Sequence, residues 1–344
     1  MWLTKYGLMY GQVPPTTGLT IWVAPAASYR VNGQTYQASD DNDGKDPYRA
    51  KRTINSALDQ CTANAGDVVY LFRGTHTVTA TNLFDVAGVT IKGESGSEYG
   101  SPALGAKPRT ILTIRGTADE CLDIRANDVM FEDLVIQGTA AYSLVSFQTT
   151  GAVGPVAFRR CWFDMDYKSA ITTLSMGLDF ANRAGGQDTA RMGTMQVAGV
   201  ATAYLEDCMF WSNGANGHAV LLATAHATFR NCRFHNDAGA WASPFQVATA
   251  YDNSALIDCV WTTSGSMTVA VSGPHAGYAA DVTDGLSIIN CRVQGNVGTD
   301  ATVAGAKASV FLNFGTNGVQ LNQNYAAGLG DTFAHGGVLI DRAN

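Results

Sequence analysis

Three aspartates are placed where their carboxyl groups could act together on a polysaccharide. Asp164 and Asp166 alternate along one predicted strand, so both would lie on the same face, about 7 Å apart. Hydrolysis of a glycosidic bond uses two carboxyl groups roughly 5 to 9.5 Å apart, one as an acid and the other as a base or nucleophile. That pair, or Asp237 with Asp166, could meet the distance.

None of these acids belongs to a recognisable catalytic motif. The six histidines show neither HxH nor HExxH spacing, and the chain contains no GxSxG sequence and no phosphate-binding loop. Solvated loop or strand-edge positions are the simpler interpretation of the aspartates, and surface or turn positions are the simpler one for the histidines. We therefore expect no catalytic residue, no metal site and no cofactor.

Six segments share a pattern that predicts how such side chains are positioned. Each reads apolar, variable, polar turn residue, then Cys or Leu, variable, apolar, and the turn residues advance by 27, 47, 24, 27 and 32 residues. We interpret the step of 47 as two turns of the repeat, one of them degenerate around residues 174–186. A period of this size is typical of a solenoid. The turn residues are Asp133, Arg160, Asp207, Asn231, Asp258 and Asn290.

The alternation within each segment has a period of two and breaks at the turn residue. Phe229, Cys232 and Phe234 would point inward, and their neighbours outward. Asp and Asn tolerate the left-handed conformation, so one such residue can bend one strand into the next. Strand, one-residue bend, strand and loop describe one coil of a parallel β-helix. We expect nine or ten coils, with weaker ones at 86–93, 110–116 and 319–328.

The stretch 41–76 precedes this repeat and differs from it. An acidic turn is followed by a predicted helix over 47–61, with Asp46 as its N-cap, and by an apolar strand, Val68–Phe72. The acidic run at 39–46 is not a calcium loop, because Ser39 and Ala50 would occupy the positions that need carboxylates. Ile54, Ala57 and Leu58 would form the apolar face of the helix.

The Asp43-Gly44 turn, the helix with "TINSAL" and the strand "AGDVVYLFRGTH" resemble the entry of right-handed parallel β-helix proteins of the pectin-lyase-like superfamily. The resemblance covers roughly residues 20 to 330 and implies an all-β fold, a single right-handed parallel β-helix whose first coil is covered by a short helix. We divide the chain into an N-terminal arm (1–25), a capping turn, helix and first strand (26–76), the β-helix (77–330) and an end segment (331–344).

The superfamily includes polysaccharide lyases, glycoside hydrolases, phage tailspikes and other virion proteins. A lyase of this type would need a calcium-binding carboxylate cluster beside a basic side chain. Asp164 and Asp166 with Arg233 or His235 are the nearest candidates, and no catalytic set of the superfamily matches them.

The cysteines repeat with the coils. They recur at one inward position in successive coils, which makes a disulfide scaffold unnecessary, and the parallel Cβ directions would strain a bridge. We expect free buried thiols, as in a protein made in a reducing cytoplasm. The row consists of Cys161, Cys208, Cys232, Cys259 and Cys291.

Composition limits the partners. The net charge of −7 without a Lys/Arg cluster argues against a nucleic-acid surface. The sequence shows no secretory signal pattern and no apolar run long enough to span a membrane.

Two outward rows predict surface contacts. Glu132 beside Arg159, and Glu206 beside Arg230, would form exposed ion pairs between coils. A second row is mostly apolar, and either a loop of the same chain covers it or it is a self-association surface. The residues that we expect at an interface are Val135, Trp162, Met209 and Val260 of this row, and Trp2, Tyr6 and Tyr10 of the N-terminal arm.

We therefore predict a non-catalytic phage virion protein that assembles in the host cytoplasm as a homotrimer. It would be a capsid decoration or spike protein on the capsid shell, or a tail appendage, and host glycan is a possible further partner. The alternatives are a tailspike-like polysaccharide lyase or glycoside hydrolase, and a non-catalytic glycan-binding adhesin.

Overall fold

A computed structural model of the chain describes the β-helix from its N-terminal end onward. The described residues are 18–78, 83–94, 102–114, 122–138, 145–147, 155–164, 178–179, 201–212, 220–222, 225–237, 240–241, 245–247, 255–267, 271–272, 286–297, 303–304, 308–312, 315–316, 319–320 and 338–339. No helix among them is long and apolar enough to cross a membrane.

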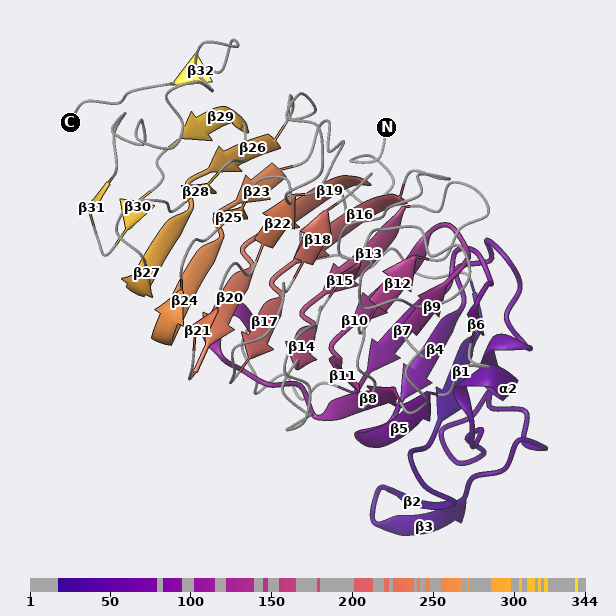
Figure 1. The fold of residues 1–344 in the computed structure, drawn as a ribbon. Coiled ribbons are helices and arrows are strands. Elements are labelled where there is room, and N and C mark those ends of the chain that lie inside the picture. Colours follow the sequence, from indigo (N-terminus) through magenta and orange to yellow (C-terminus); the bar gives the residue numbers. More distant parts are fainter. Residues whose placement is uncertain are drawn as a thin grey trace, which may run out of the picture.

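Three long sheets run along the molecule, and each of the eight coils from β4 to β28 contributes one strand to each sheet (Figure 1). Sheet 1 contains β1 (Thr20–Val23), β4 (Val68–Leu71), β7 (Thr90–Gly93), β10 (Val129–Glu132), β13 (Val156–Arg159), β16 (Ala201–Glu206), β19 (Ala225–Arg230), β23 (Ala255–Ile257), β26 (Leu286–Ile289), β29 (Ala308–Leu312) and β32 (Val338–Leu339).

Sheet 2 contains β5 (Gly74–Val78), β8 (Thr110–Ile114), β11 (Val135–Gly138), β14 (Trp162–Asp164), β17 (Met209–Ser212), β20 (Arg233–Asn236), β24 (Val260–Met267), β27 (Arg292–Val297), β30 (Gly315–Thr316) and β31 (Val319–Gln320), with β21 (Ala240–Trp241) beside β24. Sheet 3 contains β6 (Leu83–Phe84), β9 (Leu122–Ile124), β12 (Val145–Phe147), β15 (Leu178–Asp179), β18 (Val220–Leu222), β22 (Phe245–Val247), β25 (Val271–Ser272) and β28 (Val303–Ala304). The predicted parallel β-helix is confirmed.

The bend between sheet 1 and sheet 2 has the predicted conformation in six coils. The φ angle lies between +49° and +60° at all six turn residues, so each is left-handed although none is glycine. Aspartate and asparagine adopt this conformation more readily than other non-glycine residues, and they occupy five of the six positions. Arg160 is the exception, with φ of 51°.

The coil boundaries differ from the sequence prediction in three places. Strand β13 pairs directly with β16, so the step of 47 residues is one coil with a long insertion and not two turns. The segments 86–93 and 110–116 supply β7 to sheet 1 and β8 to sheet 2, and therefore belong to one coil. Strand β31, in the segment 319–328, pairs antiparallel with β30 and is not a parallel rung.

The cysteine row lies inside the β-helix, as predicted. All five side chains are buried, and the cysteines are free. The thiol of Cys232 donates to the carbonyl oxygens of Leu205 at 3.7 Å and Arg230 at 3.4 Å, and the other four thiols contact carbonyls in the same way. Burial raises the pKa of the Cys161, Cys232 and Cys291 thiols, so they stay protonated and can donate at neutral pH.

Aromatic rings fill the interior beside the thiols. Phe163, Phe210, Phe234 and Trp261 come from successive strands of sheet 2, and each is fully buried. Their ring centroids are 4.7, 4.9 and 5.3 Å apart in turn, and neighbouring rings are within 13° of parallel. The spacing follows from the distance between strands of about 4.8 Å, which suits stacked rings.

The cap of the first coil is confirmed, but its helix is shorter than predicted. Helix α2 (Ile54–Leu58) begins after Thr53, whose side chain accepts a hydrogen bond from the Ser56 amide. Asp46 instead closes a turn, because its carboxylate accepts from the Tyr48 amide at 2.7 Å. The buried face of the helix consists of Ile54, Ala57 and Leu58, as predicted.

The acidic stretch before the helix covers the free edge of sheet 1. The Trp22 amide donates to the Gly44 carbonyl at 2.7 Å, and Val23 forms a parallel bridge with Lys51. An exposed strand edge invites pairing with another chain, so this segment protects β1. Asp40 holds the segment to the helix, since its carboxylate accepts from the Thr53 amide at 2.9 Å.

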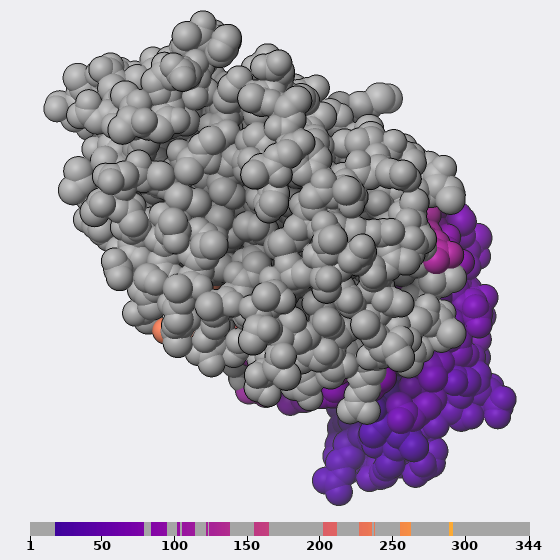
Figure 2. Space-filling view, in the orientation of Figure 1, coloured from indigo at the N-terminus to yellow at the C-terminus, as the bar shows by residue number. Residues whose placement is uncertain are grey.

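A hairpin of β2 (Ser28–Val31) and β3 (Gln34–Gln37) projects from this end of the molecule (Figures 1 and 2). Tyr29 of the hairpin packs on Tyr36 and Phe72, with ring centroids 6.1 and 5.3 Å apart. Its hydroxyl accepts a hydrogen bond from the Ala50 amide at 2.9 Å. The hairpin is therefore fixed to the end of the β-helix by an aromatic contact and one buried hydrogen bond.

The insertion between β7 and β8 contains a 3-10 helix, η2 (Pro102–Leu104).

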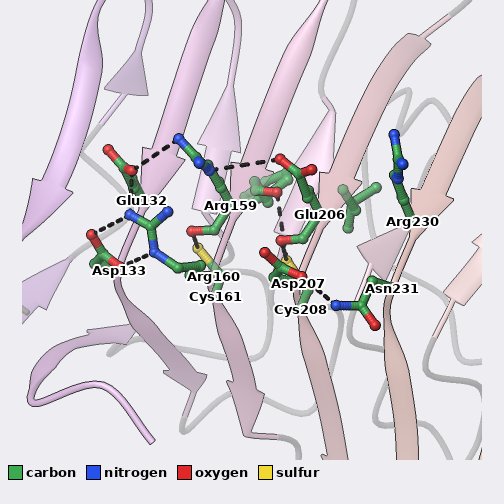
Figure 3. A network of polar contacts seen from close by, with 12 residues as sticks. Glu132, Asp133, Arg159, Arg160, Cys161, Glu206, Asp207, Cys208, Arg230 and Asn231 are labelled. Carbon is green, nitrogen blue, oxygen red and sulfur yellow. Dashed lines mark hydrogen bonds and ion pairs between the residues drawn. The ribbon is translucent and has the colours of Figure 1, made fainter. Parts of the chain in front are cut away.

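The last outward position of sheet 1 before the bend carries charges of alternating sign (Figure 3). Register aligns Lys92 with Glu132, Glu132 with Arg159, and Arg159 with Glu206. Lys92 Nζ lies 2.9 Å from the Glu132 carboxylate, and Arg159 lies 3.6 Å from both glutamates. The expected pair of Glu132 with Arg159 is confirmed. Register also places Glu206 beside Arg230, as expected, but the ion pair described for Glu206 is with Arg159. The glutamates are not exposed, because Glu132 is 1% and Glu206 8% exposed.

The turn residues form a second polar ladder along the bend. Arg160 binds both carboxylate oxygens of Asp133, and it also contacts Glu132 (Figure 3). The amides of Asn231 and Asn290 donate to Asp207 and Asp258, respectively, in the preceding coils. Each bend is thus tied to a neighbouring bend by a side chain as well as by the sheets.

Replacing a turn aspartate tests the left-handed bend. Asp258→Val should lower the free energy of unfolding by about 1–2 kcal/mol, because a β-branched residue is strained at φ of 56°. Asp258→Asn should cost much less, since asparagine tolerates this conformation and keeps an acceptor oxygen for Asn290. Urea unfolding followed by circular dichroism measures both. Equal stability of the two variants would contradict a conformational constraint at this position.

The charge ladder predicts a pH-dependent stability. Burial alone raises the pKa of Glu132, but the charges and hydrogen bonds of Lys92 and Arg160 outweigh it, so the pKa lies below its ordinary value. The ionised carboxylate therefore stabilises the fold above the pKa of an unfolded glutamate, and this contribution is lost as the pH falls through the lower folded pKa. Glu132→Gln should cost about 3 kcal/mol or more at pH 7, and the difference from the wild type should shrink in acid.

Glu206→Gln is the matched control for this prediction. Burial and the neighbouring Asp207 raise the pKa of Glu206, so ionisation of this group disfavours the folded state as the pH rises. Its replacement should cost less at pH 7 than that of Glu132. Urea unfolding at several pH values gives the difference in free energy of unfolding between each variant and the wild type. A loss of stability in Glu132→Gln that does not vary with pH would disprove the lowered pKa of Glu132.

Candidate functional site

The outer face of sheet 2 carries the side chains that the sequence singled out. Each strand contributes a first and a second outward residue, and the register stacks them in two rows. The first row contains Ile111, Val135, Trp162, Met209, Arg233 and Val260. The second row contains Thr113, Gln137, Asp164, Trp211, His235 and Thr262.

The apolar part of the first row is buried within the chain. Val135, Trp162 and Met209 pack against one another and are 0%, 8% and 2% exposed. The expectation of an exposed apolar strip is therefore wrong for these three residues. The first of the two alternatives holds for them, because the same chain covers them. Val260 is half-buried. That this row takes part in self-association remains a prediction.

The aromatic residues expected at an interface in the N-terminal arm lie outside the described residues. These are Trp2, Tyr6 and Tyr10. Asp166 is also outside them. The structure therefore describes only Asp164 and Asp237, and not Asp166, of the two predicted carboxylate pairs.

Asp164 is bound by a side chain from another coil. Lys107, in the insertion between β7 and β8, places its ammonium 2.7 Å from the carboxylate, and the same ammonium lies 5.5 Å from the centre of the Trp162 ring. Asp164 is only 6% exposed. This contact could not be predicted from the sequence, because Lys107 lies in an insertion without a repeat pattern.

The structure does not bring Asp164 and His235 together. Register places Trp211 between them, opposite Asp164 on one side and opposite His235 on the other. Two strand spacings amount to about 10 Å, so the carboxylate and the imidazole sit on alternate coils. The acid-plus-base arrangement that a lyase of this type would need is therefore not formed by these two residues.

His235 belongs to a different network, which includes Asp237. Its Nε2 lies 2.7 Å from Asp237 Oδ1, and its Nδ1 lies 2.6 Å from Thr262 Oγ1. The Trp211 indole donates to Asp237 Oδ2 at 3.2 Å, and Arg233 Nε donates to the Thr262 oxygen at 3.0 Å.

All four of these contacts can be satisfied together. The Thr262 oxygen accepts from Arg233 and shares a hydrogen bond with Nδ1 of His235, while Nε2–H of His235 donates to Asp237. Asp237 is thus held by two ring N–H groups while its side chain stays 46% exposed. Thr262 and Trp211 were missed from the sequence, although the repeat register alone would have aligned both with His235.

Sheet 3 aligns further acids that the sequence analysis did not identify. Its backbone register places Asp123 opposite Ser146, and Ser146 opposite Asp179. The two aspartates are therefore two strands apart in one row, about 10 Å along the β-helix. The strands involved are two or three residues long, which is too short for a visible alternation. In the described part of the chain, no group of three or more His, Cys, Asp or Glu side chains could hold a metal ion.

Known proteins resemble the chain in overall fold only. No protein-family model matches it, and no curated protein matches its sequence. A pectin methylesterase from Aspergillus niger is 13% identical and covers 97% of this chain and 99% of its own, with a TM-score of 0.49. A rhamnogalacturonan lyase is 13% identical over 87% of this chain and 73% of its own, with a TM-score of 0.40.

A viral protein, ORF18 of Geobacillus virus E2, is 12% identical over 76% of this chain and 57% of its own, with a TM-score of 0.30. All three TM-scores are below 0.5, so these similarities assign no activity and no partner to the chain.

Proposed function

We propose that the chain is a non-catalytic structural protein of a bacteriophage particle. It would act as a homotrimer, either as a capsid decoration or spike protein on the capsid shell or as a tail appendage. A parallel β-helix assigns no activity by itself, so the proposal rests on the outer side chains.

The observation that carries the non-catalytic part is the environment of the two predicted acids within the described residues. Asp164 is buried against the ammonium of Lys107. Asp237 accepts from Trp211 and contacts His235. A general acid or base must face the substrate atom that exchanges its proton within hydrogen-bond reach. Asp164, buried and neutralised by its own chain, is poorly placed for that task. Asp237 is 46% exposed, but each of its carboxylate oxygens already contacts a ring nitrogen of Trp211 or His235.

The interior supports assembly in a reducing compartment. Five thiols stack along one inward row, and each is buried and free. Free cysteines in such a row fit a protein that folds in the cytoplasm of a host cell, since an oxidising compartment favours disulfides. A virion protein folds in the host cytoplasm before the particle is released.

The non-catalytic proposal predicts that the protein does not cleave glycans. Incubation with uronic-acid polymers and common bacterial polysaccharides should give neither new reducing ends nor absorbance of unsaturated products. Turnover that disappears in Asp164→Ala would contradict the structural role of this residue. Turnover that disappears in Asp123→Asn or Asp179→Asn would instead place an active site on sheet 3.

The particle role predicts that the protein copurifies with phage particles and is a trimer on its own. Mass spectrometry of purified particles should detect the chain, and light scattering after size exclusion should give the mass of three 36.3 kDa chains. Particles without the chain, together with a wild-type monomer at micromolar concentration, would disprove the proposal.

Two variants separate the possible trimer contacts. Val260→Glu places a charge on a half-buried position of the first row and should reduce the trimer to a monomer if the flanks pack. Leu19→Glu, at an exposed apolar residue near the N-terminal cap, is the matched control and should leave the trimer intact. Trp162→Glu is unsuitable, because Trp162 is buried and its replacement would unfold its surroundings. A trimer that persists in Val260→Glu but not after deletion of residues 1–17 would assign the contact to the arm.

A further inference from the structure

We propose that the outer face of sheet 2 holds a binding site for an uncharged sugar ring, formed by Trp211 and Asp237 and positioned by His235, Thr262 and Arg233. This site goes beyond a structural role in a particle and does not depend on it. We call these five residues the tryptophan patch.

Asp237 is an exposed acceptor with a fixed direction. Two ring N–H groups, from Trp211 and His235, engage one carboxylate oxygen each. An ionised carboxylate offers about four acceptor positions, and these two bonds use two of them. Because 46% of the side chain is exposed, the remaining positions face outward. Two oxygens of one carboxylate can accept from two neighbouring hydroxyl groups of a sugar.

Trp211 supplies an apolar surface next to this acceptor. Its ring is half-buried and its indole nitrogen points to Asp237, so the ring and the carboxylate are held as one unit. The ring packs 6.4 Å from that of Trp162, at an angle of 44°. Tryptophan combines a large apolar face with a polar edge, which suits a ligand with an apolar C–H face and a hydroxyl-bearing rim.

The charges around the tryptophan patch favour an uncharged ligand. Arg233 and Asp237 carry opposite charges within one hydrogen-bonded network, and Lys107 and Asp164 form an ion pair on the adjoining coil. Each positive charge therefore shares its network with a carboxylate. A uronate ring would bring its own carboxylate close to Asp237, and the two like charges would repel each other.

A second observation points to a missing partner at the same place. The indole nitrogen of Trp162 is buried, and no residue of the described chain accepts its hydrogen. Buried donors are nearly always hydrogen-bonded, so an unsatisfied one beside Trp211 marks a position where a water or ligand oxygen would be favourable.

Saturation-transfer NMR with the full chain tests the site. The probes are methyl glycosides of glucose, galactose and mannose and their short oligosaccharides, with galacturonate oligosaccharides for comparison. At least one uncharged probe should show saturable binding. Asp237→Asn should weaken that binding about tenfold, because a charge-assisted hydrogen bond is lost while the shape is kept. Trp211→Ala should abolish it.

Two controls keep a folding defect apart from a binding defect. Asp43→Asn and Tyr48→Ala change a half-buried aspartate and an exposed tyrosine at the N-terminal end, and both should bind like the wild type. Circular dichroism and the melting temperature show whether each variant is folded. The proposal is overturned if no uncharged probe binds at millimolar concentration, if folded Asp237→Asn and Trp211→Ala bind as well as the wild type, or if the galacturonate probes bind more tightly.

Discussion

The left-handed bend between sheet 1 and sheet 2 is the constraint on which the rest of the structure depends. A single residue with positive φ turns the chain from one sheet into the next, and it does so at the same place in six coils. Because side chains alternate along a strand, a shift of one residue at the bend would turn every following side chain to the other face. The bend thus decides that Cys232 and Phe234 are buried while Arg233 and His235 lie outside.

The repeated part of the fold could be predicted from the sequence for the same reason. Turn residues with a known conformational preference, spaced by one coil, define the inward and outward rows without any knowledge of distant contacts. The insertions could not be predicted, because the number of residues between two bends does not say whether they form another rung. Direct pairing of β13 with β16 settles this for the step of 47 residues. The start of helix α2 was misplaced since Asp46 and Pro47 suit a turn as well as a helix start.

The candidate site was predictable in part only. The repeat register could have aligned Trp211, His235 and Thr262, because each holds the same position in successive coils. Contacts from insertions carry no periodic signal, so the ion pair of Lys107 with Asp164 could not be predicted. Burial was misjudged for a related reason. Alternation tells which side chains leave the barrel, but not whether another part of the chain covers them, as the 1% exposure of Glu132 shows.

Stacking also limits which side chains can follow one another in an outward row. Neighbours in a row are about 4.8 Å apart, so like charges would repel along the whole β-helix. Sheet 1 meets this limit by alternating Lys92, Glu132, Arg159 and Glu206. Sheet 2 meets it differently, because the neighbours of Asp164 in its outward row are the amide of Gln137 and the indole of Trp211, and no second carboxylate adjoins it there. Aromatic, amide and hydroxyl groups in an outward row also suit an uncharged, hydroxyl-bearing ligand, so the packing rule of the solenoid favours the surface on which the tryptophan patch lies.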